Sequence, residues 1–190
     1  MFWEEHDNAD YGYKIWLSQN ETDQLINETQ TDDQELAVLL GVRSGLRSDE
    51  IVRVKPKDVR DTEAGYMIRV DGAKGGKLRQ TPVPDIVAGM LRGRSPQEKP
   101  AVDVTTRTLR NWVNDAGKRL AAKTGEEMWE EVTPHDLRRT WATSLDGSDV
   151  SMNIVCDWGG WTDIDTFLDH YRGTNSPEIQ AEQRAKVDWL

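Results

Sequence analysis

Cysteine, histidine and long apolar runs are scarce in this sequence of 190 residues, and each scarcity excludes a class of protein. The single cysteine, Cys156, cannot form an intrachain disulfide, which excludes a disulfide-stabilised scaffold. Besides this cysteine, the three histidines His6, His135 and His170 provide no zinc cluster, so we expect neither a metal site nor a cofactor. No apolar stretch is long enough to span a bilayer, and residues 1–5 lack the basic and apolar regions of a signal peptide. We therefore expect a cytoplasmic protein without a membrane partner.

Basic side chains are also in the minority, because 24 Lys and Arg residues face 34 Asp and Glu residues, a net charge of −10. This balance argues against a nucleic-acid ligand, since recognition of a polyphosphate usually needs a basic surface. The charge is unevenly distributed, however: residues 41–80 hold ten basic and six acidic side chains, whereas residues 1–40 hold one basic and ten acidic ones. The acidity indicates either an interaction surface near the N-terminus or adaptation to high salt. With nine lysines against fifteen arginines and an apolar fraction of 36%, we favour a halophilic source.

The pattern of apolar residues predicts a mainly α-helical domain with a small antiparallel β-sheet, an α+β fold. Two extended runs, residues 65–70 and 78–83, flank a glycine-rich turn and predict a β-hairpin, with a third strand near Val59. Helices are expected at residues 21–30, at 36–42 after a start at 31–35, from Arg47 to about residue 54, at 85–92, at 105–123 and from Thr133 onward.

The most informative pattern is TPHDLRRTW, residues 133–141. Thr133 as N-cap and Pro134 at the first helical position start a helix that carries His135 and Arg138 three residues apart on one face. Both side chains can therefore converge on one anion. The arginine fork can hold two oxygens of a phosphate, and the imidazole can move a proton near neutral pH. Alone the spacing is weak evidence, because most such pairs form a solvated helix face.

Two further motifs supply cations of the same kind. The segment GLRSDEI, residues 45–51, follows an apolar helix, and its glycine stop signal predicts that Arg47 lies at a tight junction between two helices. Glu50, three positions later, can orient nearby hydrogen-bond donors. The segment VDGAKGGKLR, residues 70–79, places a lysine near the tip of the predicted hairpin.

These motifs, together with a tyrosine thirty residues after Trp141, resemble the catalytic domain of the tyrosine recombinase (phage integrase) family, including its Xer- and Cre-like members. The resemblance covers most of the chain and implies the tyrosine recombinase catalytic-domain fold. It predicts an acidic N-terminal arm or linker at residues 1–17, a catalytic domain at 18–173 and a C-terminal tail at 174–190. The tail either frays or docks as a helix on a neighbouring protomer. The residues that carry the resemblance are Arg47, Lys74, His135, Arg138 and Tyr171.

The resemblance also implies a role for each residue. Arg47 and Arg138 clamp the non-bridging oxygens of the scissile phosphate and stabilise the charge of the transition state. His135 acts in general acid/base catalysis, with helix capping as the alternative. Tyr171 is the nucleophile, and it needs nearby cations because tyrosine attacks poorly at its ordinary pKa. Without the other motifs, Tyr171 is more simply a ring that anchors a C-terminal helix.

For the remaining candidate residues, the resemblance leaves more than one role or more than one residue open. Lys74 resembles the hairpin lysine that protonates the leaving 5′-oxygen, and Lys77 is its rival because the register of the loop is open. Trp161 stands where the family often has histidine and either donates a hydrogen bond to the phosphate or packs in the core. Arg79 and Lys77 are expected to contact DNA, and Arg139 either does the same or faces solvent.

The implied activity is site-specific DNA recombination, integration or excision, by cleavage and rejoining through a 3′-phosphotyrosine without metal or ATP. The implied partner is double-stranded DNA. The resemblance further implies that the protein is a monomer in solution and forms a homotetramer on DNA. The region before residue 17 is too short for the N-terminal core-binding domain of full-length relatives, so the chain is a fragment or a minimal protein. Two alternatives stay open: a DNA-relaxing enzyme of the type IB topoisomerase kind, and a non-catalytic DNA-binding regulator. The presence of every motif residue favours the recombinase.

Overall fold

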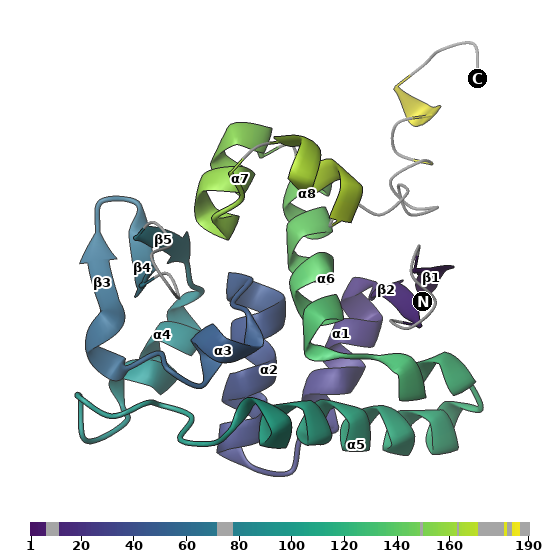
Figure 1. Ribbon diagram of the computed structural model, residues 1–190, viewed down its shortest axis with the longest axis horizontal. Coiled ribbons are helices and arrows are strands. Elements are labelled where there is room, and N and C mark those ends of the chain that lie inside the picture. The colour runs from purple at the N-terminus through teal and green to yellow at the C-terminus, as the bar shows by residue number, and fades with distance from the viewer. Residues whose placement is uncertain are drawn as a thin grey trace.

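The computed structural model describes residues 1–6, 12–71, 78–148, 150–162 and 164–170, together with residue 181 and residues 184–186. Figure 1 shows a mainly helical chain with two small antiparallel sheets, which confirms the expected fold class. Within the described part of the chain, no helix combines the length and the apolar character that crossing a membrane requires.

Four helices surround one of the apolar cores of the protein. The side-chain oxygens of Ser18, Thr31 and Thr105 accept backbone N–H bonds at three helix starts, as N-caps do. Glycines in the left-handed conformation, Gly45 and Gly125, end two of the helices. Figure 1 shows the longest helix along the base of the view and the helix that carries His135 and Arg138 (the HxxR helix) rising beside it. The four helices are α1 (Gln19–Asn27), α2 (Asp32–Ser44), α5 (Thr106–Thr124) and α6 (Pro134–Gly147).

The N-terminal residues belong to this core. Strands β1 (Phe2–Glu5) and β2 (Tyr13–Trp16) pair antiparallel, and β2 lies against α6. Ile15 is fully buried, and its N–H donates a 3.1 Å hydrogen bond to the carboxylate of Asp136. The described part of residues 1–17, predicted as an acidic arm or linker, thus packs on the helices as a two-stranded ribbon.

The predicted hairpin forms the edge of the molecule as part of a three-stranded sheet. Strands β3 (Val59–Thr62), β4 (Gly65–Val70) and β5 (Arg79–Pro82) lie in the order β3-β4-β5, all antiparallel, so the third strand expected near Val59 is confirmed. A second apolar core joins this sheet to α2. The short elements that complete this half are α3 (Ser48–Ile51), η2 (Pro56–Asp58) and α4 (Asp85–Arg92).

A third, smaller core holds the C-terminal helices. Helix α7 (Met152–Gly159) contacts both α6 and β5, and α8 (Ile164–His170) contacts α7. The buried side chains of this cluster include Trp141, Trp161 and Phe167. The short helix η4 (Glu127–Glu131) links α5 to α6. The HxxR helix therefore contacts both the N-terminal ribbon and the C-terminal helices. Most of the predicted tail, residues 174–190, lies outside the described residues.

Candidate active site

Arg47 lies at a sharp junction between α2 and α3, as the glycine stop signal predicts. Gly45 has φ of +64°, and its N–H donates to the carbonyl of Gly41, which closes the end of α2. A Cβ at Gly45 would approach Trp141 Cε3 to 2.1 Å, so only glycine fits between this turn and α6. The chain then turns directly into α3, with Arg47 as its N-cap residue. The side chain of Arg47 is 36% exposed, so it is available to a ligand from solution.

Glu50 connects the backbone and the side chain of Arg47. Its Oε2 accepts the Arg47 backbone N–H at 2.7 Å, and its Oε1 accepts a hydrogen bond from Arg47 Nη1 at 3.1 Å. Burial disfavours the charged form of Glu50, but hydrogen bonds and charge from Arg79, followed by those from Arg47, outweigh it and lower the pKa of Glu50 to about 2. The carboxylate is therefore ionised at neutral pH and orients Arg47, the role expected from the sequence.

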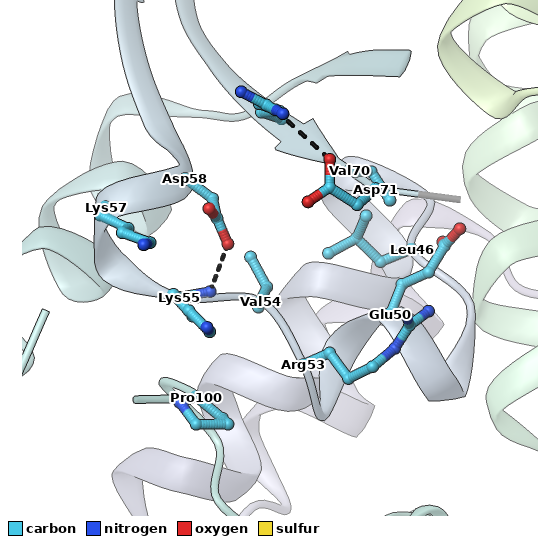
Figure 2. Close-up of a pocket in the computed structure, with 11 residues that line it drawn as sticks. Leu46, Glu50, Arg53, Val54, Lys55, Lys57, Asp58, Val70, Asp71 and Pro100 are labelled. Atoms are coloured by element: carbon cyan, nitrogen blue, oxygen red, sulfur yellow. Dashed lines mark hydrogen bonds and ion pairs between the residues drawn. The ribbon is translucent and has the colours of Figure 1, made fainter. Parts of the chain in front are cut away.

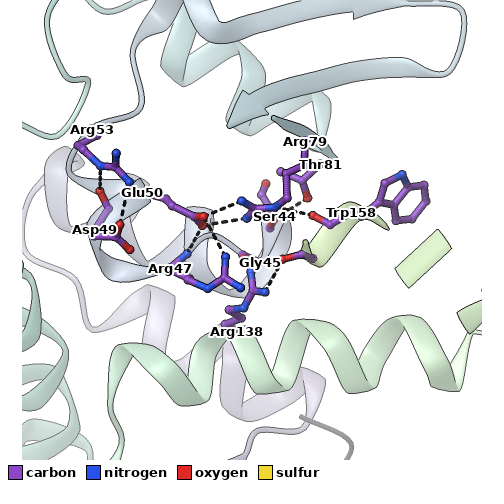
Figure 3. A network of polar contacts seen from close by, with 11 residues as sticks. Ser44, Gly45, Arg47, Asp49, Glu50, Arg53, Arg79, Thr81, Arg138 and Trp158 are labelled. Atoms are coloured by element: carbon purple, nitrogen blue, oxygen red, sulfur yellow. Dashed lines mark hydrogen bonds and ion pairs between the residues drawn. The ribbon is translucent and has the colours of Figure 1, made fainter. Parts of the chain in front are cut away.

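Arg79 is a buried partner of this carboxylate. Its Nη1 and Nη2 donate to the two carboxylate oxygens of Glu50 at 2.6 and 2.8 Å, and its Nε donates to the carbonyl of Trp158 at 2.9 Å (Figure 3). The side chain is 7% exposed. Because a buried carboxylate needs a paired cation, Glu50 holds Arg79 in the interior and away from the surface. In this DNA-free structure Arg79 therefore faces Glu50, and its expected contact with DNA stays a prediction.

Arg138 is fully buried on α6, on the side of the Arg47 junction. Its Nη1 donates to the carbonyl of Gly45, and its Nη2 donates to the carbonyl of Gly159 at 2.5 Å. Figure 3 shows Arg138 next to Arg47, on the same side of Glu50. The guanidinium of Arg138 thus links the α2–α3 junction to the C-terminal end of α7, as part of the packed interior.

Trp161 provides the surface on which Arg138 lies. The Arg138 guanidinium carbon is 4.4 Å from the Trp161 ring centroid, a cation–π contact. The indole is 8% exposed and packs against Trp141 and Phe167, with ring centroids 6.2 and 5.0 Å away. Of its two expected alternatives, the structure places Trp161 in the core, where it supports Arg138. Phe167 belongs to α8, so the helix that ends immediately before Tyr171 is packed against this pair.

His135 lies in the first turn of α6 with an exposed side chain. The protein atoms packed around part of the ring hinder hydration of the imidazolium, and the charges of Arg139, Arg138 and Arg47 repel it. Together these effects lower the pKa of His135 to about 3. In the DNA-free protein the imidazole is therefore neutral at pH 7 and able to accept a proton.

Arg139 is also buried rather than solvent-facing. It is 6% exposed and donates a 2.5 Å hydrogen bond to Asp136, whose carboxylate also accepts the N–H of Ile15. Because Asp136 is fully buried, Arg139 neutralises a charge that would otherwise lie unpaired in the core. The solvent-facing alternative for Arg139 is therefore wrong, and its contact with DNA stays a prediction.

A cleft of about 460 Å³ opens beside His135. Arg110, in the first turns of α5, lines it with an exposed side chain. The sequence analysis missed this residue. The apolar periodicity of α5 could have indicated an exposed position for Arg110, because Leu109 and Val113 point into the core and leave Arg110 on the outer face. The residues that line the cleft are His6, Tyr13, Ser48, Arg110, Thr133, Pro134, His135 and Arg139.

A second cleft, of about 390 Å³, lies between α3, η2 and β4 (Figure 2). It is rich in basic side chains, but most of them have acidic partners. Arg53 pairs with Asp49 at 2.7 Å and Arg69 with Asp71 at 3.3 Å, while Lys57 pairs with an acidic residue from the neighbouring loop. These pairs leave the cleft with little surplus charge, so it is a weaker candidate for an anion than the cleft beside His135.

The structure therefore brings Arg47, Glu50, Arg138 and Trp161 together in one network, with His135 on the same helix as Arg138. Lys74, Lys77 and Tyr171 lie outside the described residues, although β4, β5 and α8 define where these segments begin or end. Among the described residues, no group of three or more His, Cys, Asp or Glu side chains could hold a metal ion.

Comparisons with known proteins agree with this geometry. The model of the phage integrase family matches residues 15–177. The tyrosine recombinase XerA of Thermococcus kodakarensis is 29% identical over 168 residues, which cover 86% of this chain and 58% of that protein. The crystal structure of XerA recombinase matches with a TM-score of 0.71 at 22% identity, over 90% of this chain and 64% of that one.

A structure of XerH site-specific recombinase bound to difH substrate, in a pre-cleavage complex, matches with a TM-score of 0.64 at 18% identity. This match covers 92% of this chain and 54% of that one. At these identities the two structures show a shared fold. The chain spans between 52% and 62% of the length of the curated relatives that it matches.

Proposed function

Because this chain belongs to the phage integrase family, we propose that it is the DNA-cleaving part of a tyrosine-type site-specific recombinase. Its partner is double-stranded DNA. The single observation that supports the proposal best is the Arg47–Glu50 unit, because Glu50 fixes a partly exposed arginine beside Arg138, on the helix junction that Arg138 contacts. Such a preorganised group suits the charge that develops on a phosphate during transfer.

The proposed reaction is transesterification in two steps. The Tyr171 hydroxyl gives its proton to His135, and its oxygen attacks a DNA phosphodiester and forms a 3′-phosphotyrosyl bond, while the bond to the 5′-oxygen breaks. The leaving 5′-oxygen takes a proton from Lys74 and becomes a hydroxyl. A 5′-hydroxyl of the partner duplex then gives its proton back to Lys74 and attacks the phosphotyrosyl bond, and Tyr171 leaves and regains its proton from His135. Because the number of ester bonds is conserved, the reaction needs no external energy source.

Neutral His135 fits the first step. Its lowered pKa leaves the ring unprotonated at pH 7 and only weakly basic in the free protein. An arriving phosphate brings negative charge beside the ring, which offsets the repulsion by neighbouring arginines and raises the pKa again. His135 can therefore take up a proton as charge builds on the phosphate and then hold it by a charge-assisted hydrogen bond.

Arg138 requires a local rearrangement before it reaches the phosphate, because its side chain is fully buried in the free protein. We propose that phosphate oxygens replace its contact to the Gly159 carbonyl. A hydrogen bond from a guanidinium to an anion is stronger than one to a neutral carbonyl, which favours this exchange. It also couples phosphate binding to the end of α7 and so to the helices that precede Tyr171.

Assembly belongs to the same proposal. The protein would be a monomer in solution and a homotetramer on DNA, with residues 174–190 docking on a neighbouring protomer. The chain spans little more than half of the length of these curated relatives.

Covalent trapping tests the proposal. The wild-type chain and the variants Tyr171→Phe, Tyr66→Phe and Arg47→Gln are incubated with fragmented genomic DNA at low and molar salt, denatured, and freed of unattached DNA. Sequencing of the DNA that stays attached identifies the target. We expect attachment by wild type and Tyr66→Phe only. Equal attachment by Tyr171→Phe would exclude the assigned nucleophile, and no attachment by any variant would favour the non-catalytic regulator. Relaxation of supercoiled DNA without strand exchange would favour the topoisomerase alternative.

A further inference from the structure

Two arginines share a single carboxylate beside the proposed phosphate site. Glu50 accepts four hydrogen bonds: two from Arg79, at 2.6 and 2.8 Å, and two from Arg47, at 2.7 and 3.1 Å. Two guanidiniums and one carboxylate leave one unit of positive charge in this group. Since Arg79 is 7% exposed and Arg47 is 36% exposed, a ligand from solution meets this surplus charge at Arg47.

The arrangement resolves a conflict between orientation and charge. Glu50 holds Arg47 in place by accepting its hydrogen bonds, but a carboxylate paired with Arg47 alone would cancel the positive charge that a phosphate needs. Arg79 supplies the second cation from the opposite side, from the first residue of β5. It binds both carboxylate oxygens in the bidentate manner that best neutralises a carboxylate.

We propose that Arg79 is a positioning residue that neutralises Glu50, so that Glu50 orients Arg47 without cancelling its charge toward a phosphate. This inference rests on the proposed function, because it gives Arg47 a phosphate ligand. Arg79 touches neither the phosphate nor the reacting atoms in this assignment and acts through Glu50.

The same residue ties the charge group to the C-terminal helices. Arg79 Nε donates to the carbonyl of Trp158, and a Cβ at Gly160 would lie 2.7 Å from Arg79 Cδ, so its stem packs against the end of α7. Arg138 binds the next carbonyl, that of Gly159. Two consecutive carbonyls of α7 are thus held by two arginines, and both arginines reach the Arg47 junction.

The decisive experiment removes and restores the charge balance. Arg79→Met leaves Glu50 paired with Arg47 alone, Glu50→Gln/Arg79→Met restores the surplus charge of Arg47, and Arg79→Lys keeps the cation. The double variant is expected to fold, because a neutral pair of similar volume often replaces a buried ion pair without loss. Arg92→Met is the matched control, since this exposed arginine of α4 bonds to Tyr66 instead of Glu50. Circular dichroism establishes the temperature at which every variant is folded.

Two readouts are made at that temperature. The first is binding of inorganic phosphate in the absence of DNA, followed through the Arg47 Nε–H signal by NMR. The second is the cleavage rate at saturating DNA together with the Kd for DNA. For Arg79→Met we expect at least a tenfold loss of phosphate affinity and of cleavage rate, with Kd for the long duplex changed less than threefold. The double variant and Arg79→Lys should recover most of both losses, and Arg92→Met should behave as wild type.

The outcomes separate this inference from the proposed function. A folded Arg79→Met variant that binds phosphate and cleaves like wild type overturns the role of Arg79 and leaves the recombinase assignment standing. A double variant no better than Arg79→Met shows that Arg79 does not act through Glu50, which also overturns the inference. If wild type cleaves no DNA but the phosphate affinities follow the expected order, the role of Arg79 is supported and the proposed function fails.

Discussion

Replacement of Gly45 by alanine tests the junction that carries Arg47. Gly45 has φ of +64°, a conformation that costs a residue with a Cβ about 1–2 kcal/mol. The added carbon would also stand 2.1 Å from Trp141 Cε3 and 2.4 Å from Cδ2, far inside contact distance. Forcing an atom into a packed core typically adds about 1–3 kcal/mol. We therefore expect Gly45→Ala to lower the free energy of unfolding by about 2–5 kcal/mol in total.

Gly125→Ala is the matched control. Gly125 also ends a helix with positive φ, +75°, but a Cβ there would meet nothing within 4 Å. Only the conformational cost applies, so we expect a loss of about 1–2 kcal/mol. Urea unfolding followed by circular dichroism gives both values, and an unchanged m-value supports comparison of the two variants.

The difference between the two variants isolates the contact between the junction and α6. A difference of less than about 0.5 kcal/mol, the usual range of surface substitutions, would refute the placement of Trp141 against Gly45. The same contact bears on function, because the Gly45 carbonyl accepts a hydrogen bond from Arg138. We expect Gly45→Ala, where it stays folded, to cleave DNA more slowly than Gly125→Ala.

Two further predictions concern His135 and Arg110. The pKa of His135 is lowered from 6.5 to about 3 in the folded protein, so the unfolded chain binds more protons in that window and stability falls as the pH drops through it. His135→Asn should therefore flatten the change in urea midpoint between pH 7 and pH 5, a range in which Glu50 is ionised in both states; an unchanged slope would contradict the assignment. Arg110→Gln should weaken DNA binding about equally for all sequences and reduce the slope of log K against log salt by about 1, whereas Arg92→Gln should not change the slope.

Helix boundaries were predictable where the signals are local. The expected helix at residues 85–92 coincides with α4, and Thr133 with Pro134 correctly marks the start of α6. In contrast, the N-terminal ribbon was not predicted. The position of the ribbon depends on the hydrogen bond from the Ile15 N–H to the Asp136 carboxylate, across 121 residues of sequence. No local sequence pattern indicates such a distant partner.

The candidate site shows the same division between local and distant signals. The position of Arg47 at a helix junction follows from the glycine stop signal and was predicted, and Glu50 was expected to orient a nearby donor from its spacing of three residues. Burial of Arg79 depends on a carboxylate 29 positions away. One local signal did exist, because Arg79 alternates in β5 with buried Thr81 and so shares its inward face. The catalytic roles of Arg47, His135 and Arg138 remain predictions, as do those of Lys74, Lys77 and Tyr171 and the halophilic source.

The distribution of paired charges explains how an acidic chain can hold a phosphate site. Its net charge of −10 describes the whole surface, whereas a phosphate responds to the surplus charge within a few ångströms. Arg53 and Arg69 are each cancelled by a neighbouring carboxylate, and both are more than 40% exposed. Arg47 differs because Arg79 has already neutralised its carboxylate partner. High salt would screen the exposed charges strongly and the buried Glu50–Arg79 pair much less. A site built on buried neutralisation would therefore keep its charge under conditions in which an open basic surface loses most of its attraction for DNA.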